Sequence, residues 1–196
     1  MLKKLIKPHR LNRLVCITAV VLILGGCSTT PTATISESDG RVTLGYSYIG
    51  EVYGHVITRA ASEFKVEPHC ENRKVGMKNS RKAFLYAVCG FNPLSAQFAQ
   101  APLSEVVYHF IDQQLVRIDV RARGETALLD QVKDDMHHVF ASRNAQLSEI
   151  GKSSYQWTAT GRVAGVRAGG GASTGHVHVR LLDQSLIDSA PWLAME

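Results

Sequence analysis

The sequence predicts an α+β fold in which one or more antiparallel β-sheets carry helices packed on one face. Three stretches lead to this expectation. Residues 104–121 alternate apolar and polar side chains around a short turn, which indicates a β-hairpin with one wet side. Residues 125–142 repeat apolar side chains at helical spacing, and residues 83–91 form an apolar run of strand length.

The first 26 residues have the features of a secretory signal peptide. Residues 1–13 carry five basic and no acidic side chains, and an apolar run of 11 residues follows at 14–24. A run of this length is too short to span a bilayer core, which needs about 20 residues. We therefore expect export of the chain and removal of residues 1–26.

The apolar run ends in Leu24-Gly25-Gly26-Cys27, which resembles the lipobox of bacterial lipoproteins. The resemblance implies cleavage before Cys27, diacylglycerol on its sulfur and acylation of its new amino group, as with palmitate. In this family, an Asp directly after the lipidated cysteine resembles a signal for retention in the inner membrane. This chain has Ser28 at that position, so we expect the protein to be anchored at the periplasmic face of the outer membrane. The alternative is an ordinary signal peptide cut at another small residue, with Cys27 free.

Loss of the signal peptide changes the charge balance of the chain. The precursor has 22 Lys and Arg against 17 Asp and Glu, and five of the basic residues lie in residues 1–13. The mature chain therefore carries 17 charges of each sign. A neutral domain argues against nucleic-acid binding, which requires a concentrated basic patch, so we expect no nucleic-acid partner.

The four cysteines reduce to one pair in the mature chain. Cys16 leaves with the signal peptide and Cys27 takes the lipid, which leaves Cys70 and Cys89. In an oxidising compartment we expect a disulfide between them, which in the chain-entropy model stabilises the fold by roughly 3 kcal/mol. A metal pair and two buried thiols are the alternatives.

Residues 27–40 are expected to be the lipidated cysteine and a flexible tether. Ser and Thr dominate this stretch and no large apolar cluster occurs in it. A flexible chain of this length has an r.m.s. span of roughly 20 Å. One periplasmic α+β domain is then expected at 41–190, an ordinary size for a single domain.

The first half of this domain is expected to contain a β-prone stretch, a helix, a loop and three strands. Val56, Ala60 and Phe64 recur at helical spacing, although Gly54 weakens the helix. The expected ranges are, in order, 41–49, 51–64, 65–82, 83–91, 104–111 and 115–121. In the hairpin, the apolar set expected on one face is Val106, Tyr108, Phe110, Val116, Ile118 and Val120, and the wet set is Arg117, Asp119 and Arg121.

The second half is expected to repeat the order of a helix followed by strands. The helix at 125–142 has an apolar stripe, and the short link at Gly124 predicts that Val132 and Phe140 pack on Tyr108 or Ile118 of the hairpin. The expected strands are 154–158, 161–167 and 176–182, with a glycine-rich loop before the last.

This order allows two tandem helix-then-three-strand units, 41–121 and 122–190. It resembles the small envelope domains of the BamE/SmpA type and the tandem repeats of β-lactamase-inhibitor protein. The side chains that carry the resemblance are Phe110, Asp112, Leu115 and Ile118 of the hairpin, and Trp157 after the second helix. The resemblance implies a domain that binds proteins with a sheet face and has no enzymatic activity. It carries over no functional residue.

One pair of histidines is a candidate for metal binding. His176 and His178 share a face of one strand, and His55, His69 or His109 could complete a zinc site. No Asp, Glu or Cys flanks the pair at ligand spacing, so we interpret both as surface strand residues. The sequence also lacks a serine-hydrolase or phosphate-loop motif. We therefore expect no catalytic residue, metal or cofactor.

These observations favour a membrane-anchored envelope lipoprotein that acts as a non-catalytic protein-binding or scaffold module. Its expected partners are the membrane, through Cys27, and another envelope protein. The alternative is a metal-dependent or ligand-binding periplasmic protein, with the possibility of an enzyme, that uses His176 and His178.

The lipid anchor gives a direct prediction. Mass spectrometry of the mature protein should find residues 1–26 removed and lipid on Cys27, because the anchor requires both. The Cys27→Ser protein should leave the membrane fraction, since more than one acyl chain is needed for stable anchoring. A Cys27→Ser protein that still partitions with membranes would contradict the anchor.

Overall fold

A computed structural model describes residues 30–38, 41–141, 146–149, 154–158, 164–171 and 175–194. The expected signal peptide and Cys27 lie outside these residues. The described chain has the expected α+β class, with helices α1 (Tyr53–Phe64) and α2 (Thr126–Ala141). Its strands are β1 (Thr32–Ala33), β2 (Ile35–Ser38), β3 (Arg41–Leu44), β4 (Ser47–Tyr48), β5 (His69–Gly76), β6 (Ala83–Phe91), β7 (Gln97–Phe98), β8 (Ala101–Ile111), β9 (Gln114–Arg123), β10 (Gln146–Glu149), β11 (Ser154–Thr158), β12 (Ala164–Gly171) and β13 (His176–Asp183).

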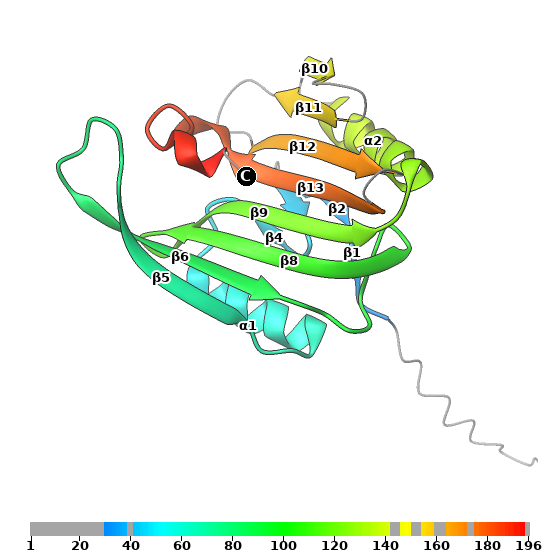
Figure 1. The fold of residues 1–196 in the computed structure, drawn as a ribbon, viewed down its shortest axis with the longest axis horizontal. Coiled ribbons are helices and arrows are strands. Elements are labelled where there is room, and N and C mark those ends of the chain that lie inside the picture. The colour runs from blue at the N-terminus through cyan, green and yellow to red at the C-terminus, as the bar shows by residue number, and fades with distance from the viewer. Residues whose placement is uncertain are drawn as a thin grey trace, which may run out of the picture.

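Ten of the described strands form one sheet (Figure 1). Its main path runs β5–β6–β8–β9–β13–β12–β11–β10, and all neighbours on this path are antiparallel. The short strands β7 and β1 extend the sheet beside β8, with β1 parallel to β7. Strands β2, β3 and β4 form a separate three-stranded sheet.

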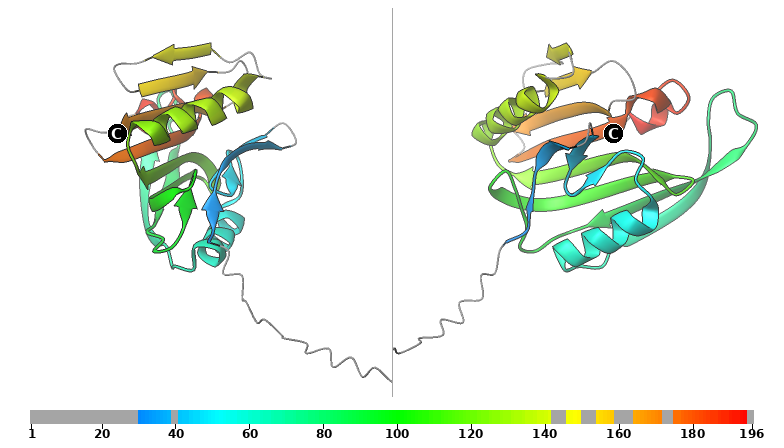
Figure 2. Two further views of the ribbon diagram at one scale, coloured as in Figure 1. Left: turned by 90° about the vertical axis from the view of Figure 1, so that its right-hand side faces the viewer. Right: turned by 180° about the vertical axis from the view of Figure 1, so that it is seen from behind.

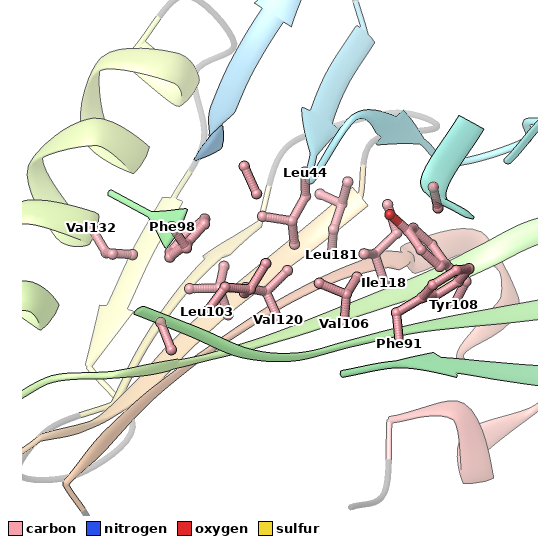
Figure 3. Close-up of a cluster of buried hydrophobic side chains, with 14 of the residues drawn as sticks. Leu44, Phe91, Phe98, Leu103, Val106, Tyr108, Ile118, Val120, Val132 and Leu181 are labelled. Carbon is pink, nitrogen blue, oxygen red and sulfur yellow. The ribbon is translucent and has the colours of Figure 1, made fainter. Parts of the chain in front are cut away.

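One face of the large sheet carries the main hydrophobic core. The right-hand panel of Figure 2 shows α1, α2 and β2–β4 in front of this face. Alternation along the central strands supplies the floor of the core (Figure 3), as Val106 and Tyr108 of β8, Ile118 and Val120 of β9, and Leu181 of β13. The sequence-based expectation that helices pack on one face is therefore correct.

Helix α1 packs on this face through one apolar stripe. Val56, Ala60 and Phe64 are buried at i, i+4 and i+8, as their spacing predicts. Gly54 lies in the first turn, so it does not interrupt the helix interior. Lys65 ends the helix in the left-handed region, with φ of 55°.

Helix α2 has the expected stripe but a different partner. Leu128, Leu129, Val132, Met136 and Phe140 are buried, and Gly124 is required because a Cβ there would lie 2.4 Å from Leu128. The helix packs chiefly on β12, with β11 and β2, so the expectation that it lies on the preceding hairpin is wrong. Figure 3 shows Val132 pointing toward Phe98 of β7. The pairing of β13 with β9 moves β12 and α2 one strand away from the hairpin.

The disulfide between Cys70 and Cys89 is confirmed, but its setting differs from the expectation. Residues 69–76 form strand β5 rather than a loop, and Cys70 stands directly opposite Cys89 of β6 with a Cα–Cα distance of 4.1 Å. Most side chains of β5 are exposed and polar, so the sequence lacks the apolar alternation typical of strands.

The fold also includes residues that precede its expected start at 41. Strands β1 and β2 correct the expected tether at 27–40, because residues 32–38 belong to the fold and Ala33 is fully buried. Among the described residues, more than three strands of the large sheet follow each helix: four longer strands, and after α1 also the short strand β7. The longer strands are β5, β6, β8 and β9 after α1, and β10 to β13 after α2. Strand β12 extends to Gly171, into the expected glycine-rich loop.

On the other face of the large sheet, the C-terminal segment, residues 184–194, packs against one end of the strands. This segment makes two 3₁₀ turns, Gln184–Leu186 and Pro191–Leu193, and buries Ala190 and Leu193. Val116 packs in this second cluster and not with Ile118, which corrects its expected face. A register shift between His109 and Phe110 of β8 places the extra residue of β9 at this point.

The burial of α2 predicts a large difference between two substitutions. Val132→Asp should lower the free energy of unfolding by roughly 3 kcal/mol or more, because a carboxylate would be buried without a partner. Asp134→Ala should have almost no effect, since Asp134 is exposed on the opposite side of the helix. Thermal unfolding of both proteins measures the difference. Equal melting temperatures would contradict the packing of α2.

Candidate binding site on the open face of the sheet

A charged cluster lies on the sheet face opposite the helices, with Asp119 at its centre. Asp119 of β9 faces Val107 of β8 and Arg180 of β13 in the strand register. Its Oδ2 accepts a hydrogen bond from Arg117 Nε and lies 2.9 Å from His109 Nε2, and its Oδ1 accepts from Arg180 Nε at 2.7 Å. Three strands thus direct their side chains at one carboxylate.

His109 links this carboxylate to a buried tyrosine. Its Nδ1 lies 2.6 Å from the hydroxyl of Tyr86 on β6. Because a carboxylate accepts and does not donate, a neutral ring protonated at Nε2 satisfies both contacts: it donates to Asp119 and accepts from the Tyr86 hydroxyl. Tyr86 and His109 are both buried. The ring is therefore held between two strands in one orientation.

The same cluster fastens the C-terminal segment. Arg117 Nη1 donates to the carbonyl oxygen of Leu193 at 2.8 Å, and Arg180 Nη1 donates to that of Ala194 at 3.1 Å. The Trp192 ring meets the Tyr86 ring edge-on, with the centroids 4.8 Å apart. The arginines thus join Asp119 on one side to the C-terminal segment on the other.

Burial and charge shift the pKa values of the two central groups. Burial lowers the pKa of His109, and this effect outweighs the opposing hydrogen bond to Asp119. Burial alone would raise the pKa of Asp119, but the hydrogen bond from His109 and the charges of Arg117 and Arg180 hold it well below its usual range. At neutral pH the site therefore contains a carboxylate, two guanidinium groups and a neutral imidazole.

Beside the cluster, the sheet face forms an open cleft of about 310 Å³. Val88, Val107 and Val120 are its apolar lining residues, and the others are charged or polar: Glu105, His109, Arg117, Asp119, Arg121, His178 and Arg180. Arg121 is about half exposed, and its guanidinium lies 3.5 Å from the Glu105 carboxylate. The cleft offers a fixed, mixed-charge surface with Arg121 at its accessible side.

The histidines singled out from sequence lie on this same face. His178 lines the cleft and stands opposite Arg121, and His176 stands opposite Arg123. Burial, Arg121 and His176 lower the pKa of His178. The described residues include no group of three or more His, Cys, Asp or Glu that could hold a metal ion. The adjacent arginine makes this strand a poor place for a cation.

The other candidate histidines are dispersed. His109 is engaged with Asp119, while His55 belongs to α1 on the opposite side of the sheet. His69 is exposed on the outer strand β5, near Glu71. The structure therefore does not bring these side chains to His176 and His178.

Sequence reasoning missed the cluster itself. Alternation assigned Arg117, Asp119 and Arg121 to one face of β9, but it expected that face to be wet. The partners come from β6, β8 and β13, and Arg180 is 61 residues from Asp119 in the chain. A signal was present in the two charged strand faces of β9 and β13, although nothing local indicates that these strands pair.

Comparison with known proteins assigns this chain to no family. No protein-family model matches it, and neither a curated protein nor a solved structure is found to match. In the described part of the chain, neither helix has the length and apolar composition needed to cross a bilayer.

The lowered pKa of His109 predicts a pH-dependent stability. The folded-state pKa lies below the unfolded value of 6.5, so the unfolded chain takes up a proton first as the pH falls. The contribution of neutral His109 to the free energy of unfolding is therefore complete above the unfolded pKa. It is lost as the pH falls from there through the folded pKa. The lowered pKa of His178 adds a loss of stability in the same direction as the pH falls.

His109→Gln should flatten the dependence of the melting temperature on pH in this window. His137→Gln is the matched control, because His137 is exposed on α2, away from the cluster. Calorimetry at a series of pH values measures the slopes. A His109→Gln protein with the wild-type slope would rule out His109 as the source.

Proposed function

We propose that this chain is a lipid-anchored protein of the bacterial cell envelope that binds another envelope protein through the open face of its sheet. The anchor is Cys27, the location is the periplasmic face of the outer membrane, and the binding is non-catalytic. The lipobox supports the anchor, and the charged cleft around Asp119 is the observation that carries the binding role.

The composition of the cleft favours a protein partner over a small apolar ligand. Small-molecule sites are mainly apolar with a few polar groups, whereas the side chains lining this cleft are mostly charged or polar. Its side chains are fixed by mutual hydrogen bonds, which reduces the ordering cost of binding a protein surface. Three arginines line the cleft against Asp119 and Glu105, so an acidic partner segment fits it best.

The pairing within the cluster also supports a non-catalytic role. Tyr86, His109 and Asp119 form a chain that resembles a proton relay in outline. Tyr86 and His109 are buried, however, and Asp119 is held as a carboxylate by two arginines. A general acid or base needs access to the proton that it transfers.

We further propose that the large sheet consists of two related halves, near the division 41–121 and 122–190. Helix α1 precedes the order β5–β6–β8–β9, and helix α2 precedes β10–β11–β12–β13. The last strands of the two halves, β9 and β13, are neighbours. The cleft would then lie at the junction of the halves. The tandem order fits the resemblance to the envelope domains and inhibitor repeats named above.

Charge reversal tests the proposed surface. A photo-crosslinking amino acid in place of Val107, inside the cleft, should give a defined adduct in native envelopes. Arg121→Glu in the same chain should weaken binding of the purified partner about tenfold or more, because an attractive contact becomes repulsive. Binding would be measured by titration calorimetry.

Lys65→Glu is the matched control, since Lys65 is an exposed cation at the end of α1 on the helix-covered side. It should leave adduct and affinity unchanged. Equal loss in both variants, or no adduct from position 107, would contradict binding at the cleft. Stoichiometric zinc bound by wild type and lost in His178→Ala would instead favour the metal-dependent alternative.

A further inference from the structure

The fold begins very close to the proposed lipid anchor. Strand β1 starts at Thr32, and only residues 28–31 separate it from Cys27. Gln97 N of β7 donates a hydrogen bond to the Pro31 carbonyl oxygen at 2.8 Å, and Ala33 is fully buried. A chain advances at most about 3.6 Å per residue, so Thr32 lies within about 18 Å of Cys27 in any arrangement.

A single exposed leucine lies at this same end of the molecule. Leu94 is 96% exposed, whereas the other exposed large apolar side chains among the described residues reach at most 50%. It belongs to the short connection between β6 and β7. Pro93 and Ala96 of this connection are buried, so they hold the backbone on the body while Leu94 points outward.

The segment that carries Leu94 and the segment around β1 contain no charged residue. Residues 83–104 and 28–36 contain no Asp, Glu, Lys or Arg. Figures 1 and 2 show the start of the described chain beside the connection that follows β6. Uncharged side chains can approach a lipid headgroup layer without the large cost of desolvating ions.

We propose that Leu94 enters the interfacial layer of the same membrane that holds Cys27. This inference rests on the proposed lipid anchor. The occupant of the exposed apolar position is lipid, because the few residues between Cys27 and β1 hold this end within reach of the bilayer. The lipid supplies the attachment, and Leu94 supplies a second contact point that restricts rotation of the domain about it. The end with β1 and β7 then faces the membrane.

A fluorescent label at position 94 tests this orientation. Leu94→Cys in the mature lipidated chain carries one reactive thiol, since Cys27 is lipidated and Cys70 is bridged to Cys89. An environment-sensitive nitrobenzoxadiazole label there should shift to shorter wavelength and resist iodide quenching in vesicles of phosphatidylethanolamine and phosphatidylglycerol. Leu147→Cys, at an exposed leucine of the distant outer strand β10, should show neither change.

The outcomes separate this inference from the anchor. If the labelled protein floats with the vesicles but position 94 behaves like position 147, the anchor stands and the membrane contact of Leu94 is overturned. If the lipidated protein does not float, the proposed anchor fails and this inference fails with it. Shielding of position 94 in native membranes but not in pure lipid vesicles would assign it to a protein partner and overturn the inference.

Discussion

The antiparallel pairing of β9 with β13 is the constraint on which most of this structure depends. It joins strands that are far apart in the chain into one continuous sheet. On one face it sets Val120 beside Val179 and Ile118 beside Leu181, in the centre of the hydrophobic core. On the other face the same register sets Asp119 opposite Arg180. A shift by one residue would exchange these two faces, so core and charged cluster specify the register together.

The charged cluster is costly to bury and is retained with all its principal groups paired. Removing ions from water costs several kcal/mol each, and mutual attraction offsets this only with good geometry and further hydrogen bonds. Asp119 meets three donors, and Arg117 and Arg180 reach the carbonyl groups of the C-terminal segment. Loss of one partner from such a set typically costs about 3–5 kcal/mol. The cluster therefore serves as a rigid base for the adjacent cleft and as a clamp for the terminus.

The position of the first strand determines how closely the domain is held to the proposed lipid anchor. A long flexible tether would let the domain sample many heights and orientations above a membrane. Docking of β1 on β7 instead leaves four residues between Cys27 and the fold. In the lipid-anchored protein that we propose, the domain lies so close to the bilayer that its orientation is affected by the chemistry of the surface beside the attachment point. Here the connection that carries Leu94 and the residues of β1 contain no charged side chain.

The sequence by itself determined the elements whose signals are local. The periodicity of α1 and α2, the apolar run of β6 and the alternation of β8 and β9 all follow from which side chains must leave water. The Cys70–Cys89 bridge followed from counting thiols. Strand β5 was missed because its side chains are mostly exposed and polar, and β10 because only four residues form it. Such strands exist through pairing with a neighbour and lack a pattern of their own.

Only the tertiary structure decided the site. Arg117, Asp119 and Arg121 were correctly placed on one strand face, but the burial of Arg117 and the pairing of Asp119 depend on β6, β13 and the C-terminal segment. The partner of α2 was likewise set by the order of strands across the sheet, which placed β12 beneath it. Strand pairing between distant segments is chosen by the combined fit of the whole core and not by any local preference. The charged cluster therefore forms only when the strands that carry its side chains have paired.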